Sequence, residues 1–376
     1  MLKRIAAALI LVAAVSFLAF FLVRDKSGRS TNRDFIAYWA AGQCLVRGQN
    51  PYDAATVFAL QKSVGLQQRK PQIMRNPPSA LILTLPLGLM DAKPAILLWS
   101  LAIIASIVIS IRLIWILHGR RSDRLHLIGY TFAPVLMCVP TGQTSAFILL
   151  GMALFLYWHE RRPLLAGAAL ALCALKPHLF FPFWLVLLVW SLNRKAHRVV
   201  LGAVLGVVIP LAVVTCFDPL LLSHYASMLR GQELDTGFVP NPSVFLRGLI
   251  SPGSLWLQYL PTLIACLWVL WYFRRHRSGW SWRTHGLLLT MVSIWVAPYS
   301  WFTDEAALLP AVLQAIYTRA DRGKSLLPFG ILNGIAVLEV AADVTMPSGG
   351  YAWTATAWLL WYLSGRPTSG KEGPAS

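Results

Sequence analysis

Long apolar runs follow one another along the whole chain, and short basic loops separate them. Of the 376 residues, 57% are hydrophobic and 13% are charged, whereas a soluble globular protein has about 25% charged residues. Apolar helices satisfy their backbone hydrogen bonds internally, as a bilayer requires. The runs lack the alternating pattern of a transmembrane β-barrel. The sequence therefore predicts an all-α polytopic membrane protein.

The apolar runs predict about 12 membrane crossings. The first, Ile5–Val23, follows Lys3 and Arg4 and lacks a small-residue cleavage site, so we interpret it as an uncleaved span. The other predicted spans are Pro94–Leu117, Leu125–Val139, Thr144–Trp158, Pro163–Leu175, Leu179–Leu192, Val199–Phe217, Leu255–Phe273, His285–Pro298, Ala306–Tyr317, Leu326–Ala342 and Tyr351–Leu363. The Arg- and Lys-rich loops between them predict the cytoplasmic side. Both termini then lie inside, with residues 364–376 as a cytoplasmic tail.

This topology assigns two longer polar stretches to the extracytoplasmic side. Residues 24–76 form the first outer loop, which we expect to lie on the membrane surface through amphipathic helices, since long structureless loops are uncommon. Residues 218–252 form the second outer loop. Residues 77–90 are apolar but too short to cross, so we expect a re-entrant segment. Residues 1–376 then make a single integral membrane domain.

The first outer loop carries a carboxylate on a predicted helix. Residues 33–53 read RDFIAYWAAGQCLVRGQNPYD, with apolar residues at helical spacing and Gly48 as the helix end. Asp34 lies in the first turn beside Tyr38. A carboxylate at the membrane surface can accept a proton from a hydroxyl group. The alternative is that Asp34 only stabilises the helix N-terminus or pairs with Arg33.

Lys176 lies between two apolar runs, AGAALALCAL and PHLFFPFWLVLLVW. An ionisable residue in such a place is costly and is a candidate for function. A lysine can neutralise a phosphate as a point charge. The alternative is that Lys176 extends to the membrane interface, which is ordinary for lysine. His178 either assists it or is an ordinary interfacial histidine.

A pair of carboxylates follows the motif PYSWF at the mouth of a predicted span. Asp304 and Glu305 can contact a sugar or handle a second proton, or they are loop charges that favour the start of the next helix. Other polar or aromatic side chains expected on the outer side as substrate-binding groups are Tyr38, Asn76, Gln143, Asn241, Arg247 and Trp301. The basic run Arg69, Lys70 and Arg75 either attracts an anionic lipid head group or is simply solvated.

Several classes of function are excluded by what the chain lacks. The net charge of +18 is concentrated in loops between spans, where it sets topology, so we expect no nucleic-acid partner. The five cysteines are scattered singly and form neither a disulfide framework nor a metal motif. No phosphate-cradling glycine loop, HExxH, GxSxG or DxD motif occurs. We therefore expect no cofactor and no metal, and no nucleotide-sugar site.

Five motifs occur in an order that resembles glycosyltransferase family 87. They are DFIAYWAAGQCLVRGQNPYD, NPPSALILTLPLGLM, GQTSAFILLGMALFL, LLAGAALALCALKPHLFFPFWLVLLV and APYSWFTDEAALLPAVL, and they extend from about residue 33 to residue 314. The resemblance implies a GT-C-like fold with about 12 transmembrane helices and extracytoplasmic amphipathic helices. It implies transfer of a sugar, typically mannose, from a polyprenyl-phosphate carrier.

The resemblance also implies roles for individual residues. Asp34 matches the acidic residue after the first span that acts as catalytic base, and Lys176 matches a lysine-proline that faces the carrier phosphate. Mannosyltransferases of the family often carry histidines after the PxSW-like motif, whereas this chain has Asp304 and Glu305 and no histidine there. This difference leaves the sugar and the acceptor open and makes Asp304 the second catalytic candidate.

The resulting hypothesis is a multi-pass hexosyltransferase of the cell envelope, in a bacterial inner (plasma) membrane, with its site on the extracytoplasmic face. It would move a sugar from a polyprenyl-phosphate donor to a hydroxyl of a lipid or glycan acceptor, with inversion and without a metal. Its partners would be these two substrates and membrane lipid. The alternative is a transporter or lipid-carrier flippase without covalent chemistry. Internal repeats, which such transporters often show, are not evident in the sequence.

Overall fold

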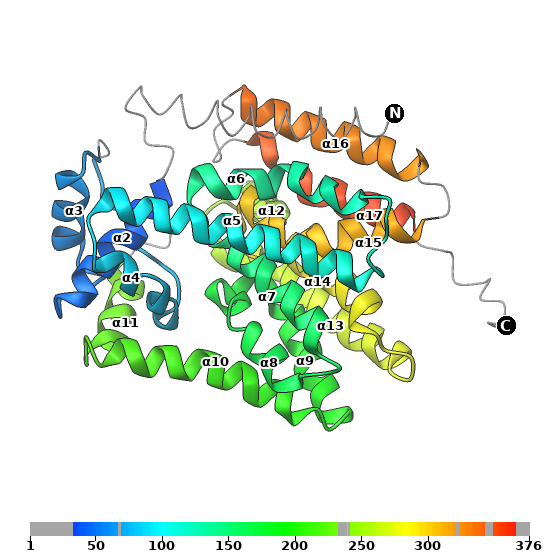
Figure 1. The fold of residues 1–376 in the computed structure, drawn as a ribbon, viewed down its shortest axis with the longest axis horizontal. Helices are drawn as coiled ribbons and strands as arrows, with labels where there is room; N and C mark the ends of the chain where they lie inside the picture. Colours follow the sequence, from blue (N-terminus) through cyan, green and yellow to red (C-terminus); the bar gives the residue numbers. More distant parts are fainter. Residues whose placement is uncertain are drawn as a thin grey trace.

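The computed structural model describes residues 33–66, 69–231, 239, 241–319, 323–342 and 349–365. Every regular element within these ranges is a helix (Figure 1). The predicted span Ile5–Val23 and most of the predicted tail 364–376 lie outside the described residues.

The helices of the first half precede the turn at Lys176. They are α2 (Arg33–Val46), α3 (Ala54–Ser63), η2 (Pro78–Leu83), α4 (Leu85–Gly88), α5 (Ala92–Leu117), η3 (Leu125–Thr131), α6 (Ala133–Thr141), α7 (Ser145–Trp158), α8 (Pro163–Ala169) and η4 (Cys173–Leu175). Those of the second half are η5 (Pro177–Phe180), α9 (Phe181–Asn193), α10 (His197–Thr215), α11 (Leu221–Gly231), α12 (Pro242–Ile250), η6 (Leu255–Gln258), α13 (Leu260–His276), the π-helix η7 (Trp282–Gly286), α14 (Leu287–Trp295), η8 (Phe302–Leu308), α15 (Leu309–Thr318), α16 (Gly323–Ala341), η9 (Gly349–Tyr351) and α17 (Thr354–Ser364).

Three helices in the described part of the chain are long and apolar enough to cross a membrane. They are α5, α10 and the continuous segment Leu255–His276 formed by η6 and α13. They confirm the predicted spans Pro94–Leu117, Val199–Phe217 and Leu255–Phe273. A fourth is added if Pro163–Leu175 and Pro177–Asn193, which meet at an angle of 118°, form one broken span.

The expected count of about 12 crossings is not confirmed by helix length. Several other predicted spans are divided or shortened in the structure. The predicted span Leu125–Val139 is divided at Phe132 between η3 and α6, and α14 and α17 contain 9 and 11 residues. Prolines near the starts of α6, α8, α9 and α15 contribute, since a proline ring interrupts the preceding helical hydrogen bonds.

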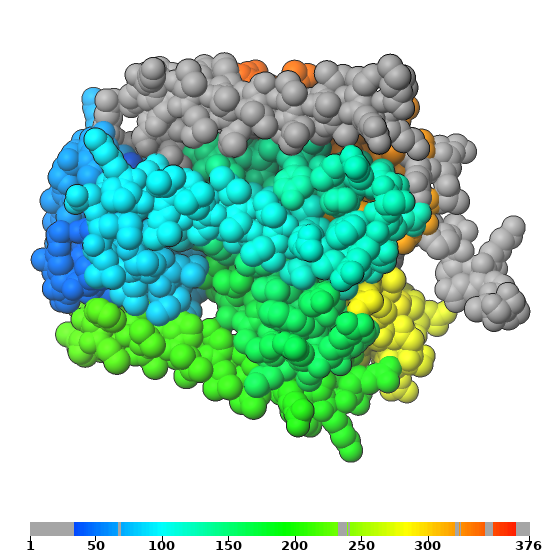
Figure 2. All heavy atoms as spheres, viewed as in Figure 1, coloured from blue at the N-terminus to red at the C-terminus, as the bar shows by residue number. Residues whose placement is uncertain are grey.

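The spanning helices expose apolar side chains as lipid contact requires. Large hydrophobic residues of α5, α10 and α13 are exposed, among them Leu97, Leu101, Leu201, Ile209 and Leu267. Figure 2 shows α5 at the surface of the molecule along most of its length. A soluble monomer rarely exposes so continuous an apolar face. The structure is therefore consistent with a membrane protein.

The molecule has two distinct ends along the direction of α5 and α10. Figure 1 shows α2, α3, α4 and α11 gathered at the end where α5 begins and α10 ends. The loops after α5 and α13, which contain the Arg-rich stretches 119–124 and 274–283, lie at the opposite end. We refer to these as the α2 end and the basic end. Their separation agrees with the predicted sorting of basic loops to one side.

Helix α2 ends before Gly48, as predicted, but it is buried all round. Residues 35–45 are all buried, so the helix is packed inside the protein and does not present one face to a membrane surface. Gly42 and Gly88 make this packing feasible, because a Cβ on Gly42 would overlap the Thr84 carbonyl. Trp39 Nε1 and Gln43 Nε2 each donate to the Met90 carbonyl over 3.0 Å. Helix α2, whose first turn carries Asp34, is thereby packed against residues 84–90.

The segment expected to be re-entrant forms two short helices beside α2. η2 has six residues and α4 has four, and Pro86 is the second residue of α4. Both pack against α2, and η2 also packs against α10. Neither is long enough to cross a bilayer.

Candidate functional site

Four charged or amide side chains from distant parts of the chain form one continuous cluster. Lys176 Nζ lies 2.6 Å from Asp304 Oδ1 and 3.1 Å from Gln143 Oε1. Gln143 Nε2 in turn donates to Asp34 Oδ2. The order is therefore Asp34, Gln143, Lys176, Asp304, and we refer to these four residues as the site cluster. The topology predicted from the sequence puts these four residues and Asn241 on the same side of the membrane. The structure joins the four by direct contacts, whereas Asn241 contacts other residues.

The orientation of the Gln143 amide follows from its neighbours. An ammonium group has only N–H donors, so the oxygen of the amide must face Lys176. The NH₂ group must then face Asp34, where a carboxylate accepts from it. Charge-assisted hydrogen bonds of this kind are stronger than neutral ones. Lys176 thus determines which group Gln143 presents to Asp34.

A glycine turn brings Gln143 to the start of α2. Gly142 ends α6 in the left-handed region, at φ 69°, which costs a residue with a Cβ more than it costs glycine. A Cβ there would also lie 3.1 Å from the Cβ of Phe35. The Gly142 carbonyl accepts from Trp99 Nε1 over 2.8 Å, which anchors the turn to α5. Gln143, which lies between α6 and α7, is therefore placed directly beside Asp34.

Asp304 is completely buried and both of its oxygens are occupied. Oδ1 accepts from Lys176 Nζ and from Ser145 Oγ, each over 2.6 Å, and Oδ2 accepts from the backbone N–H of Trp301 over 2.9 Å. Burial alone would raise the pKa of Asp304, but the Lys176 ammonium and these hydrogen bonds hold it below its ordinary value. Asp304 is consequently a carboxylate at neutral pH and a fixed partner of Lys176.

Aromatic side chains surround the cluster. Tyr38 is buried one helical turn from Asp34 and its ring contacts that of Trp99. Tyr299 accepts a hydrogen bond from Trp301 Nε1 and packs edge-on against His178, whose Nε2 is buried without a partner. Burial raises the pKa of Tyr299 to about 12, so this phenol is neutral at physiological pH.

Arg75 lies in electrostatic range of the cluster. Its guanidinium is exposed, and its charge acts on Tyr299 together with the charges of Asp304 and Asp34. The next residue, Asn76, donates from its side chain to the Leu175 carbonyl over 2.9 Å. Because this bond spans 99 residues of sequence, it holds Asn76 against the turn that carries Lys176.

Three of the predicted site residues make contacts away from the cluster. Asn241 caps α12, accepting from Val244 N over 2.8 Å, and its NH₂ donates to the Ala297 carbonyl over 2.9 Å. Arg247 is buried and donates to Gln258 over 2.9 Å. Glu305 accepts from Thr354 Oγ1 on α17 over 2.6 Å. These contacts join α12 to η6 and η8 to α17, and a substrate-binding role for the three residues stays a prediction.

Two residues at the cluster were not singled out from the sequence. Ser145 is fully buried and donates to Asp304, and its Oγ lies 3.5 Å from Lys176 Nζ. The signal was a short polar group, Gln-Thr-Ser, at the start of an otherwise apolar helix. Tyr299 carries no comparable signal, because tyrosines are common at membrane interfaces.

A comparison with known families completes this description. The model of a family described as glycosyltransferase family 87 matches residues 75–318. That range contains Gln143, Lys176 and Asp304, while Asp34 precedes it. No curated protein and no solved structure matches the chain.

Proposed function

The chain belongs to glycosyltransferase family 87, and from that premise we propose that the site cluster is where it transfers sugar. Membership of the family and the apolar helices make the protein a membrane glycosyltransferase. The observation that carries the proposal is the Gln143 amide, which connects the half-buried Asp34 to the buried pair of Lys176 and Asp304. A buried ion pair that orients one carboxylate is a preorganised arrangement of the kind that catalysis uses.

Of the two carboxylates, Asp34 is the better general base. Asp304 is fully buried, and both its oxygens accept hydrogen bonds from protein groups, so an acceptor hydroxyl cannot reach it. Asp34 is half-buried at the first turn of α2, and Gln143 engages its Oδ2. A base must come within hydrogen-bond reach of the proton that it removes. We therefore assign the base to Asp34 and a positioning role to Asp304.

The same contacts bear on the donor phosphate. Lys176 directs its N–H groups to Asp304, Gln143 and Ser145, and a phosphate would have to displace a buried carboxylate to bind it. Leaving Asp304 buried and unpaired is costly. Arg75 is exposed and its charge acts on Tyr299, and a guanidinium can hold a phosphate with two hydrogen bonds. We assign the phosphate to Arg75, with Lys176 as the residue that positions Gln143.

The proposed reaction is a single displacement with inversion. The acceptor oxygen attacks the anomeric carbon of the sugar while its proton passes to Asp34. The bond between that carbon and the phosphate oxygen breaks, and its electron pair leaves with the polyprenyl phosphate, next to Arg75. The lipid-linked donor, with mannose as the first sugar to test, fits a chain without a nucleotide-sugar motif.

The proposed face of the membrane is the extracytoplasmic one. Asp34 lies on α2, which packs against α4 and α5 at the α2 end, opposite the Arg-rich loops. Basic loops favour the cytoplasm. The proposal places the protein in a bacterial plasma membrane, with donor and acceptor meeting in the outer leaflet.

The test uses the isosteric variant Asp34→Asn. Purified protein is incubated with a panel of polyprenyl-phosphate sugars and a membrane-lipid extract, and products are identified by mass spectrometry. Asp34→Asn should lower turnover by at least about 100-fold, since general base catalysis contributes roughly 10²–10⁴. Near-normal turnover in Asp34→Asn would rule out the base.

The matched control is Asp53→Asn. Asp53 lies in the same outer loop and caps α3 through Thr56 N over 2.8 Å, a role that asparagine fills equally well. It should keep wild-type turnover. Movement of the intact donor across vesicle membranes, without any transfer product from the panel, would support the transporter alternative.

A further inference from the structure

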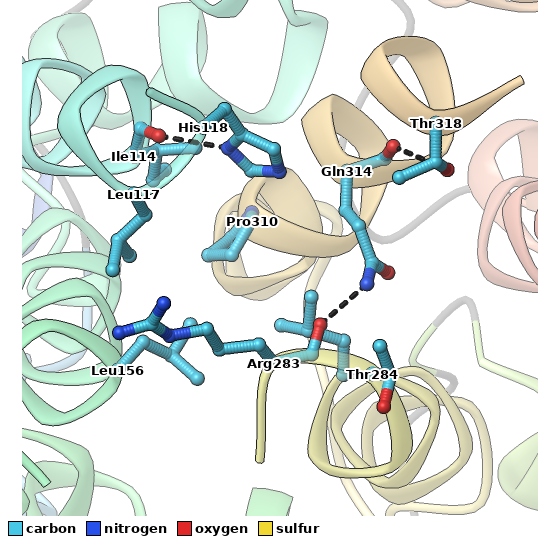
Figure 3. Close-up of a pocket in the computed structure, with 10 residues that line it drawn as sticks. Ile114, Leu117, His118, Leu156, Arg283, Thr284, Pro310, Gln314 and Thr318 are labelled. Atoms are coloured by element: carbon cyan, nitrogen blue, oxygen red, sulfur yellow. Dashed lines mark hydrogen bonds between the residues drawn. The ribbon is translucent and has the colours of Figure 1, made fainter. Parts of the chain in front are cut away.

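A cavity of about 180 Å³ lies at the basic end, away from the site cluster. Its floor is apolar and is formed by Ile114, Leu117, Leu156, Leu287 and Pro310. Its polar lining is His118, Arg283, Thr284, Gln314 and Thr318. Figure 3 shows the Arg283 side chain extended along one side toward Leu156, with the His118 ring and the Gln314 amide on other sides. We refer to it as the basic-end pocket.

Arg283 provides a positive charge that is only weakly neutralised. Its Nη2 lies 3.4 Å from a Glu160 oxygen, and the two side chains are 43% and 64% exposed. An ion pair so exposed is worth little. None of the residues that line the pocket in the described chain is acidic. The pocket therefore favours an anionic ligand.

His118 provides a hydrogen-bond acceptor. Its Nδ1 lies 2.8 Å from the Ile114 carbonyl, which can only accept, so Nδ1 carries the proton. Its ring stacks on Tyr317 with centroids 4.5 Å apart. Burial and the charges of Arg283 and Arg121 hold the pKa of His118 below its ordinary value, despite the bond to Ile114. The neutral ring then leaves Nε2 free to accept from a hydroxyl group.

The location of the pocket indicates the source of the ligand. Leu117 is the last residue of the spanning helix α5, so the pocket opens where that helix leaves the apolar part of a bilayer. The exposed Arg120 and Arg161 lie in loops of the same end. Basic residues at this level attract anionic phospholipids of the adjoining leaflet. A lipid lying along α5 reaches the pocket without leaving its leaflet.

We propose that the basic-end pocket binds an anionic phospholipid with a hydroxyl-bearing head group. The phosphate lies against Arg283, a head-group hydroxyl donates to His118 Nε2, and the upper part of one acyl chain covers Leu117, Leu156 and Leu287. The apolar floor accounts for an acyl chain, the guanidinium for the phosphate and the histidine for the hydroxyl. The site is independent of sugar transfer and lies at the opposite end of the molecule from Asp34.

The test is photo-crosslinking of the full chain in phosphatidylcholine nanodiscs. A trace of phosphatidylglycerol carries a diazirine near the top of one acyl chain, and adducts are located by peptide mass spectrometry. We expect adducts on the peptides that contain Leu117, Leu156 and Leu287. Arg283→Gln should lower this labelling about fivefold, the usual effect of one basic residue at an anionic membrane surface.

Two further variants separate the pocket from general charge and from misfolding. Arg162→Gln removes an exposed arginine at the same end that does not line the pocket, and it should leave labelling unchanged. Leu117→Trp fills the pocket without altering charge, and it should lower labelling as Arg283→Gln does.

Three results would overturn the proposal. Equal labelling by a diazirine phosphatidylcholine would show that charge does not matter. Equal labelling in Arg283→Gln and Arg162→Gln would show that the pocket arginine has no special role. Loss of labelling on addition of inorganic phosphate would show a site for a free anion and not for a lipid.

Discussion

Replacing Lys176 by methionine removes the positive charge beside Asp304 and keeps a side chain of similar length. Asp304 is completely buried, and its Oδ1 lies 2.6 Å from Nζ of a lysine that is itself 12% exposed. Removing one partner of a buried ion pair costs about 3–5 kcal/mol, since the other charge stays buried without compensation. We expect Lys176→Met to lower the free energy of unfolding by about that amount.

The double variant Lys176→Met/Asp304→Asn should recover most of this stability. It removes both charges, and replacing a whole buried ion pair by neutral side chains is often nearly neutral. The coupling between the two substitutions then measures the ion pair itself. Lys62→Met, at an exposed lysine on α3, is the matched control and should leave stability unchanged.

Sugar transfer should not recover with stability. In both variants Gln143 loses the donor that holds its oxygen, so its NH₂ group no longer faces Asp34 reliably. A hydrogen bond to a charged group is worth about 1.5–3 kcal/mol, which corresponds to a loss of roughly tenfold to hundredfold in kcat. We expect this loss in the single and in the double variant alike.

Unfolding is followed in detergent by the fluorescence of the sixteen tryptophans, and transfer by single-turnover kinetics with a lipid-linked donor. Recovery of kcat together with stability in the double variant would refute the positioning role and leave the pair purely structural. Unchanged stability in Lys176→Met would show that the ion pair does not form.

Three further predictions concern single residues. Burial raises the pKa of Glu305 from 4.5 to about 8, so its protonated form stabilises the fold at low pH and this contribution is lost as the pH rises through about 8. The thermal unfolding midpoint of the wild type should therefore decrease as the pH is raised from about 5 to about 8, whereas that of Glu305→Gln should change less over this range. Parallel plots of midpoint against pH for the two proteins would contradict the assignment. Gly142→Ala should lower the free energy of unfolding by about 1–2 kcal/mol, because residue 142 has a left-handed backbone conformation. It should also lower the rate of sugar transfer by displacing Gln143. Normal transfer kinetics would show that the turn tolerates a Cβ. Asn241→Ala should lower the free energy of unfolding by about 0.5–2 kcal/mol, because α12 loses its N-cap, and it should leave turnover per folded molecule unchanged. A raised KM for the donor would instead identify Asn241 as a substrate ligand.

The membrane class and three spans could be predicted because they depend on local composition. Uninterrupted apolar length is a property of the sequence itself, and α5, α10 and the segment Leu255–His276 have it. The end of the helix that carries Asp34 could likewise be predicted, since Gly48 takes a positive φ two residues after its last residue, Val46. The remaining crossings were harder, because prolines divide apolar runs into pieces whose joining depends on what packs around them.

The contacts of individual polar side chains could not be predicted from local composition. Asp304 and Glu305 are adjacent in sequence, and nothing in the residues themselves shows which of the two contacts Lys176. In the 3₁₀ helix η8 successive side chains point in different directions, so one faces Lys176 and the other faces Thr354 on α17. Asn241 likewise has a side chain that could bind a substrate, and only its contacts in the structure show that it caps a helix.

By itself the sequence determined that the chain is a helical membrane protein, and it predicted that Asp34, Gln143, Lys176, Asn241 and Asp304 lie on one side of it. Those conclusions follow from apolar length, basic loops and the order of motifs. Only the tertiary structure decided that Lys176 is bound to Asp304 and turns the Gln143 amide toward Asp34. The bonds join residues 109 and 128 positions apart, and side-chain direction over such distances depends on the packing of α2, the turn at Gly142 and η8 together.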